Sequence, residues 1–172
     1  YTPSPFRCRK PPLIGSLAMA NPHQDRYFGC STDALSLARQ LYNRMAEFPI
    51  LSPHGHVNPE LLASNNAFSD PVALLITPDH YITRLLASQG VSYEALNIPT
   101  LKGGAGNQNS AEEIWKLLAT NWVAFAGTPS RMWFEEILTE IFEINLPFTP
   151  EHAQRIFEEI SEKITQIGRA HV

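Results

Sequence analysis

The sequence predicts a mostly α-helical fold with one β-strand. Three observations support this prediction. In five segments, apolar residues recur every three or four positions, as on the buried face of an amphipathic helix. Residues typical of helix starts, including three Thr-Pro pairs, precede four of these segments. One further segment is short, apolar and bounded by prolines, as is typical of a buried strand.

The first helix is expected from about Thr32 to Glu47, and the strand follows at Ile50–Ser52. A single strand leaves its backbone groups without sheet partners. The segment is therefore either a loop, or a strand whose neighbours lie in sequence that this chain does not contain. The second alternative agrees with a chain that is part of a longer protein.

Four helices are expected in the second part of the chain. Proline suits the first turn of a helix because its missing N–H would be unpaired there, and threonine or a residue just after it can cap that turn. Ser110 and Glu113 have the spacing of a capping box, and Gly90 is a natural stop for the helix before it. The expected starts are Thr77-Pro78, Ser110, Thr128-Pro129 and Thr149-Pro150. The glycine-rich loop between the second and third helices, 102–108, lacks a nucleotide-binding pattern and is expected to be a flexible connection.

Composition and charge exclude several classes of protein. The 172 residues are 44% hydrophobic and 17% charged, which is ordinary for a globular protein. The net charge of −4 gives no basic surface, so nucleic acid is not an expected partner. No apolar run is long enough to span a membrane, and a cytoplasmic location is expected. Two cysteines, Cys8 and Cys30, cannot form a disulfide framework.

The two ends look unlike the rest of the chain. Residues 1–18 hold four prolines and no acid, and we interpret them as a leader upstream of a true start at Met19, since their apolar run is too broken for a secretory signal. Residues 167–172 match one reading frame of a sequencing adapter and are interpreted as a non-native tail. Between them, we expect a first helix and strand over 19–57 and a helical region over 58–166, with a net charge of −8.

His54 and His56 are the candidate metal ligands. On an extended segment, residues two apart point to the same face, with side chains about 6–7 Å apart. Two imidazoles placed in this way can bind one divalent metal, and Gly55 between them allows close approach of a ligand. A bare His-x-His also occurs by chance, and a metal needs further ligands that the sequence does not reveal. The position of the pair at the end of an apolar strand favours the metal site, because parallel α/β barrels carry their reactive groups there.

Other polar residues have plainer interpretations. His80 and Tyr81 lie in the first turn of the helix expected at Pro78, where His80 could serve as a capping or packing residue and Tyr81 falls on an apolar stripe. Asp79 is expected to stabilise the helix start, and Arg84 to be solvated. His23 and His152 show no pattern of partners and are expected at the surface.

Three motifs together resemble the amino-terminal part of the uronate isomerase family, also called the glucuronate isomerase family. They are Pro53-His-Gly-His-Val-Asn-Pro59, Ile76-Thr-Pro-Asp-His-Tyr-Ile-Thr-Arg84 with Gln89-Gly-Val91, and Gly127-Thr-Pro-Ser-Arg-Met-Trp133. The resemblance covers essentially all of 19–166. It implies the amino-terminal part of a metal-dependent (β/α)8 barrel of the amidohydrolase superfamily, consisting of the first strand and a helical insertion.

The resemblance also implies an activity. The family interconverts D-glucuronate with D-fructuronate, and D-galacturonate with D-tagaturonate. By resemblance, His54 and His56 bind a divalent metal, expected to be zinc, and His80 and Tyr81 contact the uronate substrate. The catalytic base and the remaining metal ligands are expected in sequence that this chain does not contain, so the chain alone is expected to be inactive. Uronate sugars are the expected partners, together with further copies of the chain in a homo-oligomer.

Two alternatives remain open. A different amidohydrolase-type hydrolase would use His-x-His equally well to activate a water molecule. A non-enzymatic helical interaction module would contain the two histidines by chance. The Asp-His-Tyr and Thr-Pro-Ser-Arg-x-Trp motifs argue against the hydrolase, and downstream barrel strands would exclude the module.

Overall fold

The computed structural model describes residues 31–49, 51, 54, 59–64, 67–100 and 109–167. The predictions for residues 1–18, for both cysteines and for the glycine-rich loop lie outside these residues. The chain divides into two compact units, residues 1–53 and residues 54–172, which we describe separately. Within the described residues, every helix is too short or too polar to cross a membrane.

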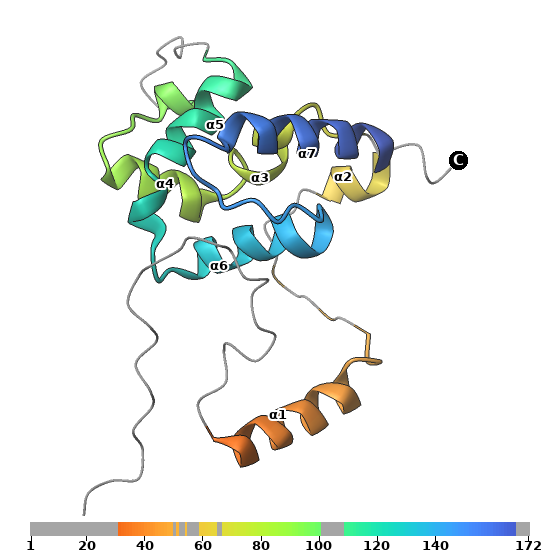
Figure 1. Cartoon of the computed structure of the whole chain (residues 1–172). Coiled ribbons are helices and arrows are strands. Elements are labelled where there is room, and N and C mark those ends of the chain that lie inside the picture. Colours follow the sequence, from red (N-terminus) through yellow and green to blue (C-terminus); the bar gives the residue numbers. More distant parts are fainter. Residues whose placement is uncertain are drawn as a thin grey trace, which may run out of the picture. The chain divides into compact units, whose positions relative to one another are not determined.

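The described part of the first unit is one helix, α1, which spans Thr32–Met45 (Figure 1). Ser31 caps it, because its hydroxyl accepts a hydrogen bond from the backbone N–H of Ala34 at 3.3 Å. The helix ends two residues before the predicted Glu47. Of the predicted strand, only Leu51 is described, and it has no regular structure. The prediction of a strand at Ile50–Ser52 therefore falls largely outside the described residues.

All regular secondary structure in the described part of the second unit is helical, and this part contains no strand. This agrees with the predicted mostly α-helical fold. The α-helices are α2 (Pro59–Ser64), α3 (Pro71–Leu75), α4 (His80–Ser88), α5 (Ala111–Thr120), α6 (Pro129–Glu136) and α7 (Ala153–Ile167). Three shorter elements lie between them: the 3₁₀ turns η1 (Glu94–Leu96) and η2 (Trp122–Phe125), and a π-helical segment, η3 (Ile137–Ile141), that continues α6.

The predicted caps of α5 and α6 are confirmed. Ser110 and Glu113 form the capping box of α5, in which each side chain binds the backbone N–H of the other residue. The hydrogen bond from the Ser110 backbone holds the pKa of the Glu113 carboxyl below its ordinary value. Thr128 caps α6 by accepting a hydrogen bond from the N–H of Arg131, with Pro129 in the first turn.

Two helix starts differ from the prediction. The helix expected at Pro78 begins at His80, because Asp79 rather than Thr77 is its cap and Pro78 lies in the preceding turn. The helix expected at Pro150 begins at Ala153, after a turn in which the N–H of His152 donates to the carbonyl of Thr149. In both cases Thr-Pro marks the turn before the helix.

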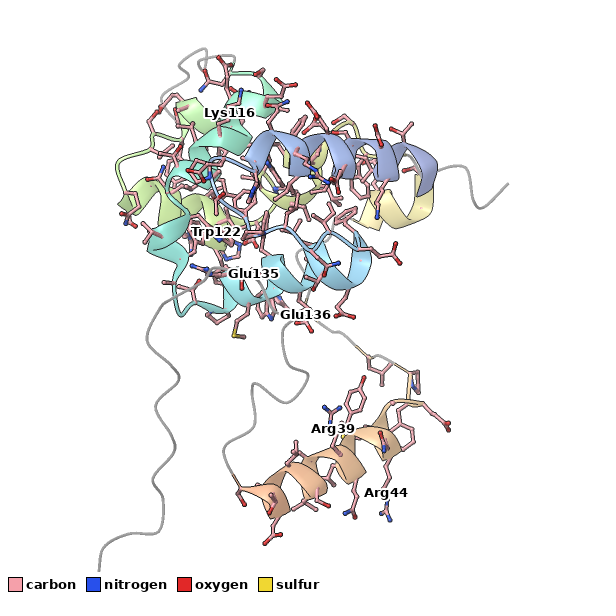
Figure 2. All side chains as sticks on the ribbon, in the orientation of Figure 1. Arg39, Arg44, Lys116, Trp122, Glu135 and Glu136 are labelled. Carbon is pink, nitrogen blue, oxygen red and sulfur yellow. The ribbon has the colours of Figure 1, made fainter. Side chains whose placement is uncertain are left out.

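One core joins the helices of the second unit. Helices α3, α5 and α7 contact one another, and Figure 1 shows α7 running beside α5 with α3 close to both. Two buried tryptophans lie at the centre of an aromatic cluster, and Figure 2 shows Trp122 surrounded by side chains inside this unit. The other members of the cluster are Phe125, Phe134, Phe148 and Phe157. The rings lie 4.8–5.8 Å apart, which is the spacing of favourable aromatic pairs.

The two buried tryptophans differ in one hydrogen bond. The indole Nε1–H of Trp115 donates to the carbonyl of Ala153 at 2.9 Å and so ties α5 to α7. The indole Nε1–H of Trp122 is buried without a partner among the described residues. An unpaired buried donor costs free energy, so removing it should cost less than removing a paired one.

We therefore expect Trp115→Phe to lower the free energy of unfolding by about 1–2 kcal/mol more than Trp122→Phe does. Both substitutions replace an indole by a phenyl ring in the same cluster, and the hydrogen bond to Ala153 is lost only in Trp115→Phe. Urea unfolding of the two variants measures this difference. Equal losses of stability would contradict this expectation.

Candidate functional site

His80 and Tyr81 are the first two residues of α4. The Asp79 carboxylate accepts hydrogen bonds from the backbone N–H groups of Tyr81 at 2.8 Å and Ile82 at 3.4 Å, which fixes where the helix begins. The rings of His80 and Tyr81 lie beside each other, with centroids 4.2 Å apart and planes tilted by 34°. The prediction that Asp79 stabilises the helix start is supported by these contacts.

The opposite face of α4 anchors this helix start in the core. Ile82, Thr83 and Leu86 are buried, whereas Tyr81 is 52% exposed. The apolar periodicity alone placed Tyr81 on the buried stripe, and that interpretation is wrong. The helix therefore presents Tyr81 at its surface, with His80 half-buried beside it. Arg84, one turn later, is exposed as predicted.

Tyr81 lines a groove between three helices. The groove has a volume of about 280 Å³ and is mostly apolar. Helix α3 contributes one wall, the turn before α4 and its first turn contribute another, and α6 with the start of η3 contributes the third. The lining residues are Leu74, Leu75, Pro78, Asp79, Tyr81, Trp133 and Ile137.

Of the two predicted metal ligands, the structure describes only His54. It lies in a bend of the chain and is exposed. His56 lies outside the described residues, and within those residues no three His, Cys, Asp or Glu side chains come together as a metal site would require. Imidazole nitrogens are suitable ligands for a divalent metal, so the donor chemistry of the pair fits, whereas the structure neither assembles nor excludes the site.

Two residues were not assigned correctly from the sequence. Trp133 lies in one of the motifs that carry the resemblance, but no role was assigned to it; it lines the same groove as Tyr81, which depends on how distant parts of the chain fold together. His152, expected at the surface, is half-buried, and its Nδ1 lies 3.1 Å from the carbonyl oxygen of Pro147. His152 therefore orders the turn before α7 and is no part of the groove.

Two solved structures that resemble this chain are sugar-acid isomerases. A crystal structure of glucuronate isomerase from Caulobacter crescentus superposes on 83% of this chain with a TM-score of 0.74 and 35% sequence identity. A uronate isomerase structure from Thermotoga maritima covers 76% of the chain with a TM-score of 0.64 and 29% identity. The matched regions are 29% and 27% of those two chains. The helical fold of this chain thus resembles part of the fold of these two sugar-acid isomerases.

Sequence comparisons identify the family. Uronate isomerases from Brucella melitensis and Mesorhizobium japonicum are 44% and 41% identical to this chain over 142 and 145 residues. The family model described as glucuronate isomerase matches residues 26–170. The chain belongs to the glucuronate isomerase family. It spans about 30% of the length of these relatives.

Proposed function

We propose that this chain is the amino-terminal part of a uronate isomerase (EC 5.3.1.12) that interconverts D-glucuronate with D-fructuronate, and D-galacturonate with D-tagaturonate. One observation supports this most strongly: in a chain of the glucuronate isomerase family, Asp79 caps α4 at His80 and Tyr81, and Tyr81 is exposed and lines a groove. The family membership also favours an isomerase over the hydrolase and over the interaction module.

The reaction requires groups that hold the sugar while a proton moves between C1 and C2. Tyrosine and neutral histidine can both donate hydrogen bonds to sugar oxygens, including an oxygen on which negative charge develops. In the first turn of α4 the backbone N–H groups of Tyr81 and Ile82 donate to the Asp79 carboxylate, so the contacts to the sugar would come from the side chains. We propose that His80 and Tyr81 bind the uronate there and steady its oxygens.

A divalent metal, which we propose to be zinc, would be held by the imidazoles of His54 and His56. When bound, such a metal polarises a carbonyl and lowers the pKa of a neighbouring hydroxyl or water. The remaining metal ligands and the base that removes the C2 proton would lie outside this chain, on later strands of a (β/α)8 barrel. We further propose that the complete enzyme is cytoplasmic and assembles as a homo-oligomer.

The test is whether the full-length protein converts glucuronate to fructuronate. Proton NMR of the sugar monitors the conversion. We expect the full-length enzyme to be active and the 172-residue chain, purified beside it, to be inactive. The chain alone should lack turnover because the base and the remaining metal ligands are proposed to lie outside it. A full-length protein without activity on either glucuronate or galacturonate would contradict the proposal.

A further inference from the structure

We propose that one apolar face of helix α6 and the π segment η3 is an intramolecular interface, covered in the full-length protein by sequence that this chain does not contain. Three residues define this face, which we call the α6 face: Trp133, Ile137 and Ile141. The inference rests on the proposed function, in which this chain is one part of a larger enzyme. It goes beyond that function by assigning the surface on which the remainder of the enzyme packs.

The apolar stripe of α6 and η3 is only partly covered by the core of the second unit. The stripe consists of the α6 face together with Phe134, Leu138 and Phe142, and it is as wide as the stripes with which helices face a core. Phe134, Leu138 and Phe142 are at most 3% exposed. Trp133 and Ile141, by contrast, are 54% and 64% exposed. The α6 face is therefore the half of the stripe that the described residues leave largely uncovered.

The α6 face continues into the groove beside α4. Trp133 and Ile137 line this groove together with Leu74 and Leu75 of α3, so its lining is mostly apolar. The groove volume of about 280 Å³ is below the range of about 300–1,000 Å³ that is typical of small-molecule sites. Single exposed apolar side chains are normal in folded proteins, whereas a contiguous apolar surface marks an interaction site. The groove and the α6 face therefore suit the apolar side chains of another protein segment.

The charged residue of the groove lining does not oppose such a contact. This residue is Asp79, whose carboxylate already accepts hydrogen bonds from the backbone N–H groups of Tyr81 and Ile82. Burial of a polar or charged group is most costly when the group has no hydrogen-bond partner. An apolar segment can therefore close the groove without leaving the Asp79 carboxylate unpaired.

The remainder of the full-length protein is the occupant that these observations favour. This chain spans about 30% of the length of its relatives, so about 70% of such a protein lies outside it. In the proposed function, that remainder supplies the catalytic base and further metal ligands, which must approach a sugar held by His80 and Tyr81. Tyr81 also lines the groove, so sequence that reaches the start of α4 comes next to the α6 face. A second copy of the chain is the other occupant that the experiment distinguishes.

The experiment measures how fast N-ethylmaleimide labels Ile141→Cys and Val123→Cys in the full-length protein. Val123 of η2 is the matched control, because it is 81% exposed and lies outside both the stripe and the groove. The two positions fall in separate tryptic peptides, 117–131 and 132–155, neither of which contains a native cysteine. Mass spectrometry of these peptides therefore reads each position alone, and the urea-unfolded protein gives the reference rate for each.

We expect Ile141→Cys to be labelled at least about 100-fold more slowly in the native protein than in the unfolded protein, because the covering segment excludes the reagent. Val123→Cys should be labelled within about tenfold of its unfolded rate. The protection at position 141 should persist when the protein is diluted, since a contact within one chain does not depend on concentration.

Two results would overturn the inference. One is labelling of Ile141→Cys within about tenfold of its unfolded rate, which would show a free face. The other is protection that disappears on dilution to monomers, which would show that a second copy covers the face. Trp133→Cys, in the same peptide as position 141, replaces Ile141→Cys if that variant does not fold, with the same outcomes. Labelling is measured without turnover, so an inactive wild-type enzyme contradicts the proposed function separately.

Discussion

His54→Ala and His56→Ala should each lower the metal content and the turnover of the full-length enzyme by about 100-fold. A structural or catalytic zinc is held by three or four protein ligands, so losing one removes a large share of its coordination. Even residues that only support metal ligands cost about 10–100-fold in affinity or activity when they are replaced. Histidines two apart on an extended segment are well placed to act together on one ion.

Metal content per protein, measured by plasma mass spectrometry beside steady-state kinetics, checks this result. The matched control is His23→Ala, which removes a histidine outside the His-x-His motif and should retain both metal and rate. Addition of a chelator to the wild-type enzyme should reproduce the loss of activity. Normal metal content and turnover in both single variants would show that these histidines do not bind the metal.

His80→Ala and Tyr81→Phe should each lower kcat/KM on glucuronate by about tenfold or more. A hydrogen bond to a charged group contributes about 1.5–3 kcal/mol, which corresponds to about tenfold to 150-fold in kcat/KM. The fold should survive, because Tyr81 is half exposed and because the cap depends on Asp79 and backbone N–H groups that both variants retain. Arg84→Ala, at an exposed position one turn further along α4, is the matched control and should keep wild-type kinetics.

A thermal melt recorded on the same samples separates chemistry from folding. Unchanged melting temperatures with reduced kcat/KM support substrate contact at His80 and Tyr81. Wild-type kinetics in both variants, or activity lost only because the variants unfold, would return these residues to an ordinary packing role.

The sequence predicted those features of the fold that depend only on residues close together in the chain, such as helix caps. The capping box of α5 needs only Ser110 and Glu113, three residues apart, and the structure contains it as predicted. The start of α4 was placed two residues early because Thr77 and Asp79 are both competent caps, and only the folded chain shows that Asp79 is used. Helix α3 was missed because five residues are too few to show a helical period, although Asp70-Pro71 is a cap followed by an N1 proline.

The candidate site is formed by residues that are far apart in the sequence and come together only in the folded chain. His80 and Tyr81 could be singled out because their motif resembles that of a known family. The exposure of Tyr81 could not be predicted, since its helical position lies on the apolar stripe, and neither could its shared groove with Trp133. Such a groove forms only when α3, α4 and α6 pack together, and packing of this kind is set by the whole core.

A crystal structure of the full-length protein with zinc and glucuronate would show whether the two histidines bind the metal and whether the start of α4 contacts the sugar. Anomalous scattering would locate the metal. We expect a zinc ion bound by the imidazoles of His54 and His56 at about 2.0–2.1 Å, with His80 and Tyr81 within hydrogen-bond distance of the bound glucuronate. A metal bound without either histidine, or a sugar bound away from the first turn of α4, would contradict it.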